Sequence, residues 1–256
     1  MKTLDVVRWN DGKREVTEEI IADEAYLHLN IEEVGKFQIS ITPEKIQPFA
    51  AGFIYTQGFI ESLDQIDRFR INSSQKSQFT AKIKLQKGNC DSETEGKETL
   101  WREEGYGITP WSPAPRPIKS SMKITPERLI SCSQNALADT PEFAKTGAFH
   151  YAFLISPSGN IAARAKDIGR HNAVDKAVGQ LLLGEDSLTE AFLLSTGRIS
   201  KVMVMKCLRA KIPLIVSRGA PLMGAVELAT QSNLGLVGFL RDRRFNIYAG
   251  EGFING

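Results

Sequence analysis

The sequence of 256 residues predicts an α/β fold with a largely parallel sheet, preceded by a smaller, strand-rich α+β domain. Two observations carry this prediction. The second half of the chain alternates short apolar runs, typical of buried strands, with stretches whose apolar residues recur at helical spacing. The first third shows apolar residues alternating with polar ones, as in half-buried antiparallel strands. Four prolines mark residues 103–123 as a loop or linker, so the predicted domains are residues 1–102 and 124–256.

The N-terminal domain is predicted to contain a β-hairpin followed by a helix. Residues 25–41, "AYLHLNIEEVGKFQISI", hold two alternating runs separated by "EEVG". Thr42 is then expected to cap a helix that has Pro43 at its first position. The run "FTAKIKLQ", which begins at Phe79, predicts a further strand. The apolar face of the helix is expected to consist of Ile46, Phe49, Ala50 and Phe53.

The C-terminal domain is predicted to begin with a helix capped at Thr125, with Pro126 at its first position. The runs "AFHYAFLI" and "IAARAKDI" flank the turn "SPSGN" and predict a hairpin that leads into a second helix. That helix is expected to be amphipathic, with a buried stripe of Val174, Ala177, Val178, Leu181 and Leu182. The remaining strands and helices are predicted at "EAFLLST", "KVMVMKCLRA", "IPLIVS", "LMGAVELATQ", "LGLVGFL" and "RFNIYA".

Composition excludes several classes of protein. The formal net charge of +2 gives no general attraction to nucleic acid or to a membrane surface. The first residues lack the apolar stretch of a secretory signal, and no apolar run approaches about 20 residues, so we expect a cytoplasmic protein. Cys90, Cys132 and Cys207 lie far apart, which argues against a disulfide scaffold or a CxxC metal site. Cys132 and Cys207 are expected to be packing residues.

Residues 166–179, "KDIGRHNAVDKAVG", place six polar side chains just where an apolar helical pattern begins. The free N–H groups and partial positive charge of a helix N-terminus favour anions. We therefore interpret this segment as part of a site; the alternative is a capped helix with surface ion pairs. The six residues are Asp167, Arg170, His171, Asn172, Asp175 and Lys176.

Three of the predicted strands end in similar turns: "STGRIS", "SRGAP" and "FLRDRRFN". Ligands of open parallel sheets bind outside the carboxyl ends of the strands. Glycine permits close backbone approach there, and guanidinium groups bind phosphate. The turns predict a phosphate or pyrophosphate site; the alternative is that the arginines only solvate the edge of the sheet. The residues concerned are Ser195, Gly197, Arg198, Arg218, Arg241, Arg243 and Arg244.

No metal site is predicted. The chain contains three histidines, His28, His150 and His171, and lacks the H-x-E and P-C-x-x-C elements of a zinc deaminase. His150 and His171 could converge as acid–base or ligand contacts, or could be hydrogen-bonded structural residues. The sequence likewise leaves open whether Asp167 and Asp175 contact a ligand or brace the helix start.

Five ordered segments resemble the formate dehydrogenase accessory protein family (FdhD/NarQ), and "IQPFAAGFIYTQGFIES" near the N-terminus resembles it too. The resemblance implies a three-layer fold like that of the cytidine deaminases, without zinc, around a mixed, largely parallel sheet. It also implies that sulfur is carried as a persulfide from a cysteine desulfurase to the bis(molybdopterin guanine dinucleotide) molybdenum cofactor, before insertion into the formate dehydrogenase apoenzyme. The segments are "TGAFHYAFL", "DIGRHNAVDKAVG", "STGRISKVMVMK", "SRGAPLMGAVELA" and "LVGFLRDRRFNIY".

The resemblance places a cofactor-binding stretch at Phe239, Leu240, Arg241, Asp242, Arg243 and Arg244. We expect Ser195, Gly197, Arg198, Arg218 and His171 to contribute to binding the guanine nucleotide or pterin cofactor. The family's C-G-x-C-G pair is missing, because its loop corresponds to "GITPWSPAPRPIKSS", residues 107–121, and Cys132 does not match it. The catalytic residues are therefore left unassigned.

Three functions follow from these patterns. The first is an accessory protein that binds the molybdenum cofactor and supports its sulfuration and insertion, in which sulfur transfer is the open step. The second is a cofactor-binding chaperone without catalytic chemistry. A hydrolase or deaminase that acts on a nucleotide is third, because the metal ligands are missing. A homodimer is compatible with each of them.

Overall fold

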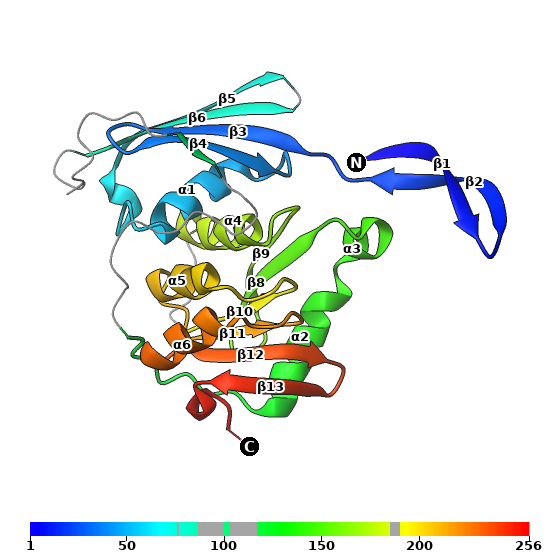
Figure 1. The fold of residues 1–256 in the computed structure, drawn as a ribbon. Helices are drawn as coiled ribbons and strands as arrows, with labels where there is room; N and C mark the ends of the chain where they lie inside the picture. Colours follow the sequence, from blue (N-terminus) through cyan, green and yellow to red (C-terminus); the bar gives the residue numbers. More distant parts are fainter. Residues whose placement is uncertain (76, 87–99, 103–116, 185–189, 256) are drawn as a thin grey trace.

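The structure is a computed structural model that describes residues 1–75, 77–86, 100–102, 117–184 and 190–255. Within these residues the strands form a two-stranded hairpin, a five-stranded sheet and a six-stranded sheet (Figure 1). Each of the two larger sheets carries its own cluster of buried apolar side chains. No helix in the described part of the chain is long and apolar enough to span a membrane.

The N-terminal part contains the five-stranded sheet, in the order β5-β6-β3-β4-β7, and helix α1. The predicted hairpin is confirmed, since β3 and β4 pair antiparallel from Ala25 opposite Ile41 to Ile31 opposite Gly35. The predicted apolar face of α1 is confirmed as well, because all four of its residues are buried. The elements are β1 (Lys2–Asn10), β2 (Lys13–Ile21), β3 (Ala25–Ile31), β4 (Gly35–Ile41), α1 (Ile46–Thr56), β5 (Ile66–Gln75), β6 (Gln78–Leu85) and β7 (Leu100–Arg102).

The predicted cap of α1 is wrong. The helix begins at Ile46, and its N-cap is Lys45 with a left-handed φ of 53°. Thr42 is buried and bonds instead to the second half of the chain. Its N–H donates to Asp167 Oδ2 at 3.1 Å, and its Oγ1 accepts the N–H of Ile168 at 3.1 Å. These tertiary hydrogen bonds replace the local cap that the sequence suggested.

The hairpin β1–β2 projects away from the rest of the molecule (Figure 1). Val7 lies opposite Val16 in its register, and both are more than half exposed, as is Trp9. An isolated two-stranded hairpin is only marginally stable in water, because it buries little apolar surface. Little apolar packing therefore supports this hairpin.

The second half of the chain contains the predicted strands and helices in their predicted order, together with one short helix, α3, that was not predicted. Thr125 caps α2 as expected, because its side chain accepts the N–H of Arg128. Of the predicted linker, residues 103–116 lie outside the described residues, whereas Ile118 and Met122 are buried in the core of this half. The elements are α2 (Pro126–Ala138), α3 (Pro141–Thr146), β8 (His150–Ile155), β9 (Ile161–Asp167), α4 (Arg170–Leu183), β10 (Phe192–Ser195), α5 (Lys201–Arg209), β11 (Leu214–Ser217), α6 (Met223–Gln231), β12 (Gly235–Arg241) and β13 (Arg244–Ala249).

The six-stranded sheet is mixed, in the order β13-β12-β11-β10-β8-β9. It is not largely parallel, which corrects the prediction. Only the β10–β11 and β11–β12 pairs are parallel, whereas β8–β9, β10–β8 and β12–β13 are antiparallel. The outer pairs β8–β9 and β12–β13 are hairpins, whose strands pair antiparallel, and the β8–β9 hairpin joins the parallel centre through the antiparallel β10–β8 pair.

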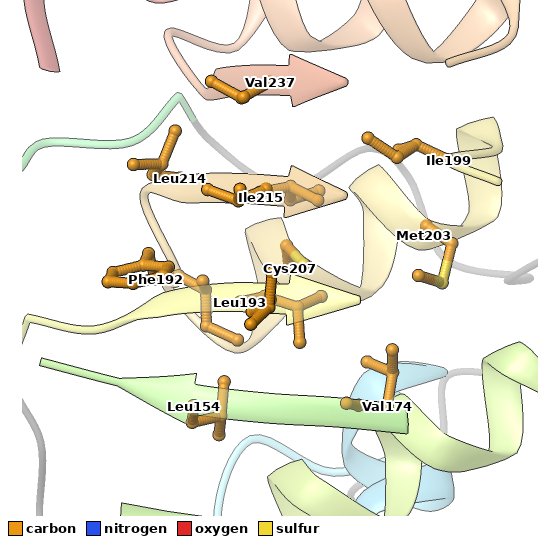
Figure 2. Packing of buried hydrophobic residues seen from close by; sticks show 14 of the residues in the cluster. Leu154, Val174, Phe192, Leu193, Ile199, Met203, Cys207, Leu214, Ile215 and Val237 are labelled. Carbon is orange, nitrogen blue, oxygen red and sulfur yellow. The ribbon is translucent and has the colours of Figure 1, made fainter. Parts of the chain in front are cut away.

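The core of the second half lies around the parallel strands. Strands β10 and β11 are buried along their whole length, so both faces of the sheet are covered there. Figure 2 shows Cys207 of α5 among Leu193, Ile215 and Met203 in this packed layer. Cys132 on α2 is also buried. Both cysteines therefore pack as the sequence suggested.

Helices α1 and α4 join the two halves and touch backbone to backbone. A Cβ placed on Gly52 would lie 1.9 Å from the carbonyl oxygen of Asp175. A Cβ on Gly179 would lie 1.7 Å from the carbonyl oxygen of Pro48. Both distances are far below any real contact, so only glycine allows this crossing.

The prediction that α4 is amphipathic is wrong. Its residues from His171 to Gly179 are all buried, the charged ones included. The reason is that α4 packs against α1 on one side and against β8 and β9 on another. The predicted stripe is present, with Val174, Ala177 and Val178 fully buried, but the opposite face meets protein instead of water.

Candidate functional site

The loops after β10, β11 and β12 form one continuous surface, which we call the strand-end rim (residues 195–200, 217–221 and 239–244). The N–H of Arg218 donates to the carbonyl of Ser195 at 3.2 Å. The N–H of Ile199 donates to Ala220 at 3.0 Å, and that of Phe239 donates to Gly219 at 3.2 Å. The predicted convergence of the three strand ends is therefore present.

The serines and glycines of the strand-end rim bind each other. Ser195 is buried, and its Oγ accepts the N–H of Gly197 at 3.2 Å. Ser217 Oγ accepts the N–H of Gly219 at 2.9 Å and lies 2.5 Å from the carbonyl oxygen of Gly197. A Cβ on Gly219 would lie 2.7 Å from the backbone nitrogen of Arg198, so the two loops touch. Ser195 and Gly197 thus hold the rim together and leave the outer surface to the arginines.

One guanidinium group of the strand-end rim, that of Arg241, is held by a hydrogen bond to the backbone of a neighbouring loop. Arg241 Nη1 donates to the carbonyl oxygen of Arg218 at 2.6 Å, which ties the end of β12 to the loop after β11. Arg241 and Arg244 lie directly opposite each other in the β12–β13 register. Residues paired in this way point to the same face, and like charges there repel. Arg198 and Arg243 are exposed, as are Arg241 and Arg244.

Phe239 is an exposed aromatic side chain held in an unusual conformation. Its φ is 54°, a left-handed value that bulky residues rarely adopt, and its side chain is 42% exposed. The cause is an irregularity in the β12–β13 register between Gly238 and Arg241, which turns Phe239 outward while Leu240 stays buried. Asp242 is also left-handed, and its carbonyl accepts Gln134 Nε2 of α2 at 2.8 Å.

Asp167 and Lys176 of the polar segment form a fully buried ion pair, with Nζ and Oδ2 2.7 Å apart. Asp167 Oδ1 also accepts the N–H of Gly169 at 2.8 Å and Asn172 Nδ2 at 3.0 Å. Lys176 donates to the carbonyl of Thr42 at 2.9 Å. These groups bind the end of β4 to the start of α4. The interpretation as surface ion pairs is therefore wrong, because the pair is buried between the two halves.

Asp175 forms a second buried ion pair, with Lys206 of α5 at 2.7 Å. Thr56, at the end of α1, donates its hydroxyl to Asp175 Oδ1 at 2.6 Å. Burial raises the pKa of Asp175, while Lys206 and Thr56 oppose the shift. Lys206 also lies 5.7 Å from the ring centre of Phe53. Sequence patterns do not identify Thr56 or Lys206 as members of this cluster, because Asp175 lies 119 positions from Thr56 and 31 positions from Lys206.

Arg170 and His171, the other two polar residues, lie beside the strand-end rim. A Cβ on Gly197 would lie 2.8 Å from the Cβ of Arg170, so that arginine packs on the rim. His171 is buried, and its Nε2 lies 3.0 Å from Ser200 Oγ. Burial, together with Lys206, lowers the pKa of His171 to about 2, so its imidazole is neutral. Asp167 and Asp175 are thus held in buried ion pairs, and His171 is hydrogen-bonded to Ser200 of the rim.

The cysteines offer no exposed thiol in the described part of the chain. Cys132 is 4% exposed, and Cys207 is fully buried. Burial raises the pKa of the Cys207 thiol, so it carries little of the thiolate needed for sulfur chemistry. Cys90 lies outside the described residues. Among the described side chains, no group of three or more His, Cys, Asp or Glu could hold a metal ion.

Known proteins resemble this chain over nearly its whole length. The model of the FdhD/NarQ family matches residues 22–255. A sulfur carrier protein FdhD from Methanothermobacter thermautotrophicus is 26% identical over 254 residues, 97% of this chain and 96% of the relative. A protein of the same name from Sulfolobus acidocaldarius is 29% identical over 250 residues, again 97% and 96%. A crystal structure described as a formate dehydrogenase accessory protein from Desulfotalea psychrophila matches with a TM-score of 0.75 at 25% identity, covering 99% of both chains.

Proposed function

We propose that this chain, which belongs to the FdhD/NarQ family, is a formate dehydrogenase accessory protein that binds the bis(molybdopterin guanine dinucleotide) molybdenum cofactor as its cargo. In this role it supports sulfuration of the cofactor and its insertion into the apoenzyme, with a cysteine desulfurase as the sulfur donor. The names of the relatives support the role, because they describe sulfur carriers and a formate dehydrogenase accessory protein.

The observation that carries the proposal is the pairing of Arg241 and Arg244 on the strand-end rim. Two guanidinium groups on one face of a hairpin repel each other, and an anion bonded to both would relieve that repulsion. Guanidinium groups bind phosphate oxygens through paired N–H donors. A pyrophosphate of the cofactor is a polyanion of suitable chemistry for this surface. The exposed ring of Phe239 offers a neighbouring aromatic face for a guanine or pterin ring.

The test is to remove the paired arginines. We expect that Arg241→Ala and Arg244→Ala each weaken binding of guanosine diphosphate by about tenfold, since a hydrogen bond to a charged group contributes about 1.5–3 kcal/mol. Titration calorimetry measures the affinity. Binding to the unmodified chain should also weaken as salt is added, because exposed charges are screened.

The matched control is Arg70→Ala, which removes an exposed arginine from β5. This control has the same net charge as Arg241→Ala. A difference in affinity between the two variants therefore reports where the removed charge lies, not the change in net charge. If both rim variants bind guanosine diphosphate as tightly as the control, the cofactor does not bind at this rim.

The missing cysteine pair favours a second candidate function, that of a cofactor-binding chaperone without sulfur chemistry. Such a protein would shield the cofactor and deliver it to the apoenzyme. Persulfide transfer requires a thiolate that attacks the outer sulfur of the donor persulfide and releases the donor thiol. Cys132 and Cys207 are both buried, which hinders that attack. The chain has one other cysteine, Cys90.

Mass spectrometry after incubation with a cysteine desulfurase and cysteine separates the two functions. We expect no added sulfur on Cys132 or Cys207, because neither thiol is accessible. Sulfur on Cys90 that disappears in Cys90→Ser, but persists in the control Cys132→Ser, would identify a relocated sulfur carrier. If no cysteine gains sulfur while the desulfurase is active, the chaperone function is supported instead.

A further inference from the structure

His150 lies at the first position of β8, beside the strand-end rim. It pairs with Asp167 in the β8–β9 register. The next residue, Tyr151, exchanges two hydrogen bonds with Thr196 of the rim. The Tyr151 N–H donates to Thr196 Oγ1 at 3.0 Å, and the Thr196 N–H donates to the Tyr151 carbonyl at 3.1 Å. The start of β8 is therefore fixed against the β10–α5 loop.

Arg170 and Arg198 approach the same place from two other elements. Arg170 is the first residue of α4, and its side chain packs against Gly197 of the rim. Arg198 follows Gly197 directly and is exposed. Both guanidinium groups act on His150, since each of them lowers its pKa through its positive charge. The start of β8, the start of α4 and the β10–α5 loop thus lie side by side, and the charges of Arg170 and Arg198 act on His150.

His150 differs from His171 in how its ring nitrogens are used. His171 Nε2 is bonded to Ser200 Oγ, which caps α5 and also accepts the N–H of Met203. In contrast, His150 Nδ1 is buried and has no hydrogen-bond partner among the described residues. A buried polar group without a hydrogen bond is destabilising, so such groups call for an explanation. A ligand atom that bonds to Nδ1 would remove this cost.

The charges around His150 favour an anionic ligand. Among the described residues, the charged groups that act on His150 are Arg170, Arg198 and Asp167, and the charge of His150 acts in turn on His171. Both oxygens of Asp167 are already bonded, one of them to Lys176. Burial, more than the neighbouring positive charges, lowers the pKa of His150, so the imidazole is neutral at neutral pH.

We propose that His150, Arg170 and Arg198 form a binding site for a compact oxyanion, a phosphate or pyrophosphate group, where β8, α4 and the β10–α5 loop meet. The preference of the site for an oxyanion follows from these three residues and does not depend on the proposed function. Only the source of the anion rests on the proposed function, under which it is a pyrophosphate of the cofactor rather than a free inorganic anion. A bound anion favours the charged imidazole, so His150 takes up a proton as the anion binds.

Titration calorimetry with inorganic pyrophosphate and with guanosine diphosphate tests the site on the full chain. Measurements near neutral pH in two buffers of different ionisation enthalpy report proton uptake. We expect pyrophosphate binding with uptake of up to about one proton, and about tenfold weaker binding in His150→Gln and Arg198→Ala. Uptake should disappear in His150→Gln and persist in the control His28→Gln, which alters an exposed histidine on β3.

The outcomes separate this site from the proposed function. Arg198 is exposed, so Arg198→Ala tests the site without disturbing the core. Absence of pyrophosphate binding, or unchanged affinity and uptake in His150→Gln, overturns the site. If His150→Gln abolishes uptake while Arg241→Ala and Arg244→Ala leave guanosine diphosphate binding unchanged, the site stands and the cofactor role fails. If guanosine diphosphate affinity depends on Arg241 while pyrophosphate affinity and proton uptake are unchanged in His150→Gln, the site is refuted and the role is retained.

Discussion

At the scale of single residues, most of the polar segment at the start of α4 stabilises the fold, because two of its carboxylates form buried ion pairs. Asp175 and Lys206 are almost completely buried, and Thr56 supplies a further hydrogen bond to the pair. Removing one partner of a buried ion pair leaves the other charge without compensation. The cost is therefore larger than the net contribution of the intact pair.

We expect Asp175→Ala to lower the free energy of unfolding by about 3–5 kcal/mol, because Lys206 would stay buried without its carboxylate. Urea unfolding followed by circular dichroism measures the change. The control Asp5→Ala alters an exposed aspartate on β1 and should change stability by less than about 0.5 kcal/mol. Equal effects of the two substitutions would show that the buried pair does not stabilise the junction.

At the scale of elements, the contact of α1 with α4 decides how the two halves fit together. Gly52 and Gly179 face each other where the helices cross, and each lies against backbone atoms of the other helix. Backbone atoms cannot rotate away as a side chain can. An added methyl group therefore forces the helices apart and strains the buried ion pairs beside them.

We expect Gly52→Ala to destabilise the chain by about 1–3 kcal/mol, despite the higher helix propensity of alanine. The matched control is Gly224→Ala in α6, where the nearest atom to an added Cβ is 3.7 Å away, in Lys201. That change should leave stability unchanged or raise it by up to about 1 kcal/mol. Thermal unfolding of both variants measures the difference. A loss of stability in the control equal to that of Gly52→Ala would contradict the proposed crossing.

At the scale of the whole molecule, buried neutral histidines make stability depend on pH. The pKa of His171 is about 2 in the folded chain, against about 6.5 for an unperturbed histidine. Between these values the unfolded chain binds a proton that the folded chain does not, so stability falls as the pH falls. His150 acts in the same direction, whereas the raised pKa of Asp175 acts in the opposite one. The pKa of Glu142 is lowered to about 2, so this residue reduces the free energy of unfolding only below about pH 4.5, where the unfolded chain binds a proton that the folded chain does not.

We expect the free energy of unfolding to fall more steeply in the unmodified chain than in His171→Gln between about pH 6.5 and pH 4.5. The two curves should converge by up to about 1.4 kcal/mol for each pH unit. Urea titrations across this range give the slopes. Comparison of the two chains cancels the contributions of Asp175 and His150. His28→Gln, which changes an exposed histidine, should keep the steep slope of the unmodified chain; a parallel curve for His171→Gln would refute a neutral buried His171.

Much of the fold was predictable, because periodicity and turn residues act locally. The hairpin of β3 and β4, the cap at Thr125 and the alternation from β10 to β13 all follow from such patterns. The errors arose where distant segments meet. Thr42 is hydrogen-bonded to residues 125 and 126 positions away, so a local cap was the wrong expectation for it.

The candidate site was predictable only in outline. The sequence shows that two strand ends carry glycine, hydroxyl groups and arginine and that a third carries arginine, and parallel pairing of β10, β11 and β12 brings those ends together. The sequence could not reveal that Ser217 bonds to the carbonyl of Gly197, or that Arg241 anchors on the carbonyl of Arg218. Those bonds depend on how the loops are spaced after the sheet has formed.

The sequence by itself determined the kinds of elements, their order and the residues that reach one edge of the sheet, because these depend on side-chain spacing along the chain. Only the tertiary structure decided which polar groups are buried ion pairs and which remain for a ligand. Asp175 and Thr56 lie 119 positions apart, and Lys176 and Thr42 lie 134 apart. Burial and pairing depend on which elements pack together. The contact between two helices that meet at glycine forms only when the chain folds.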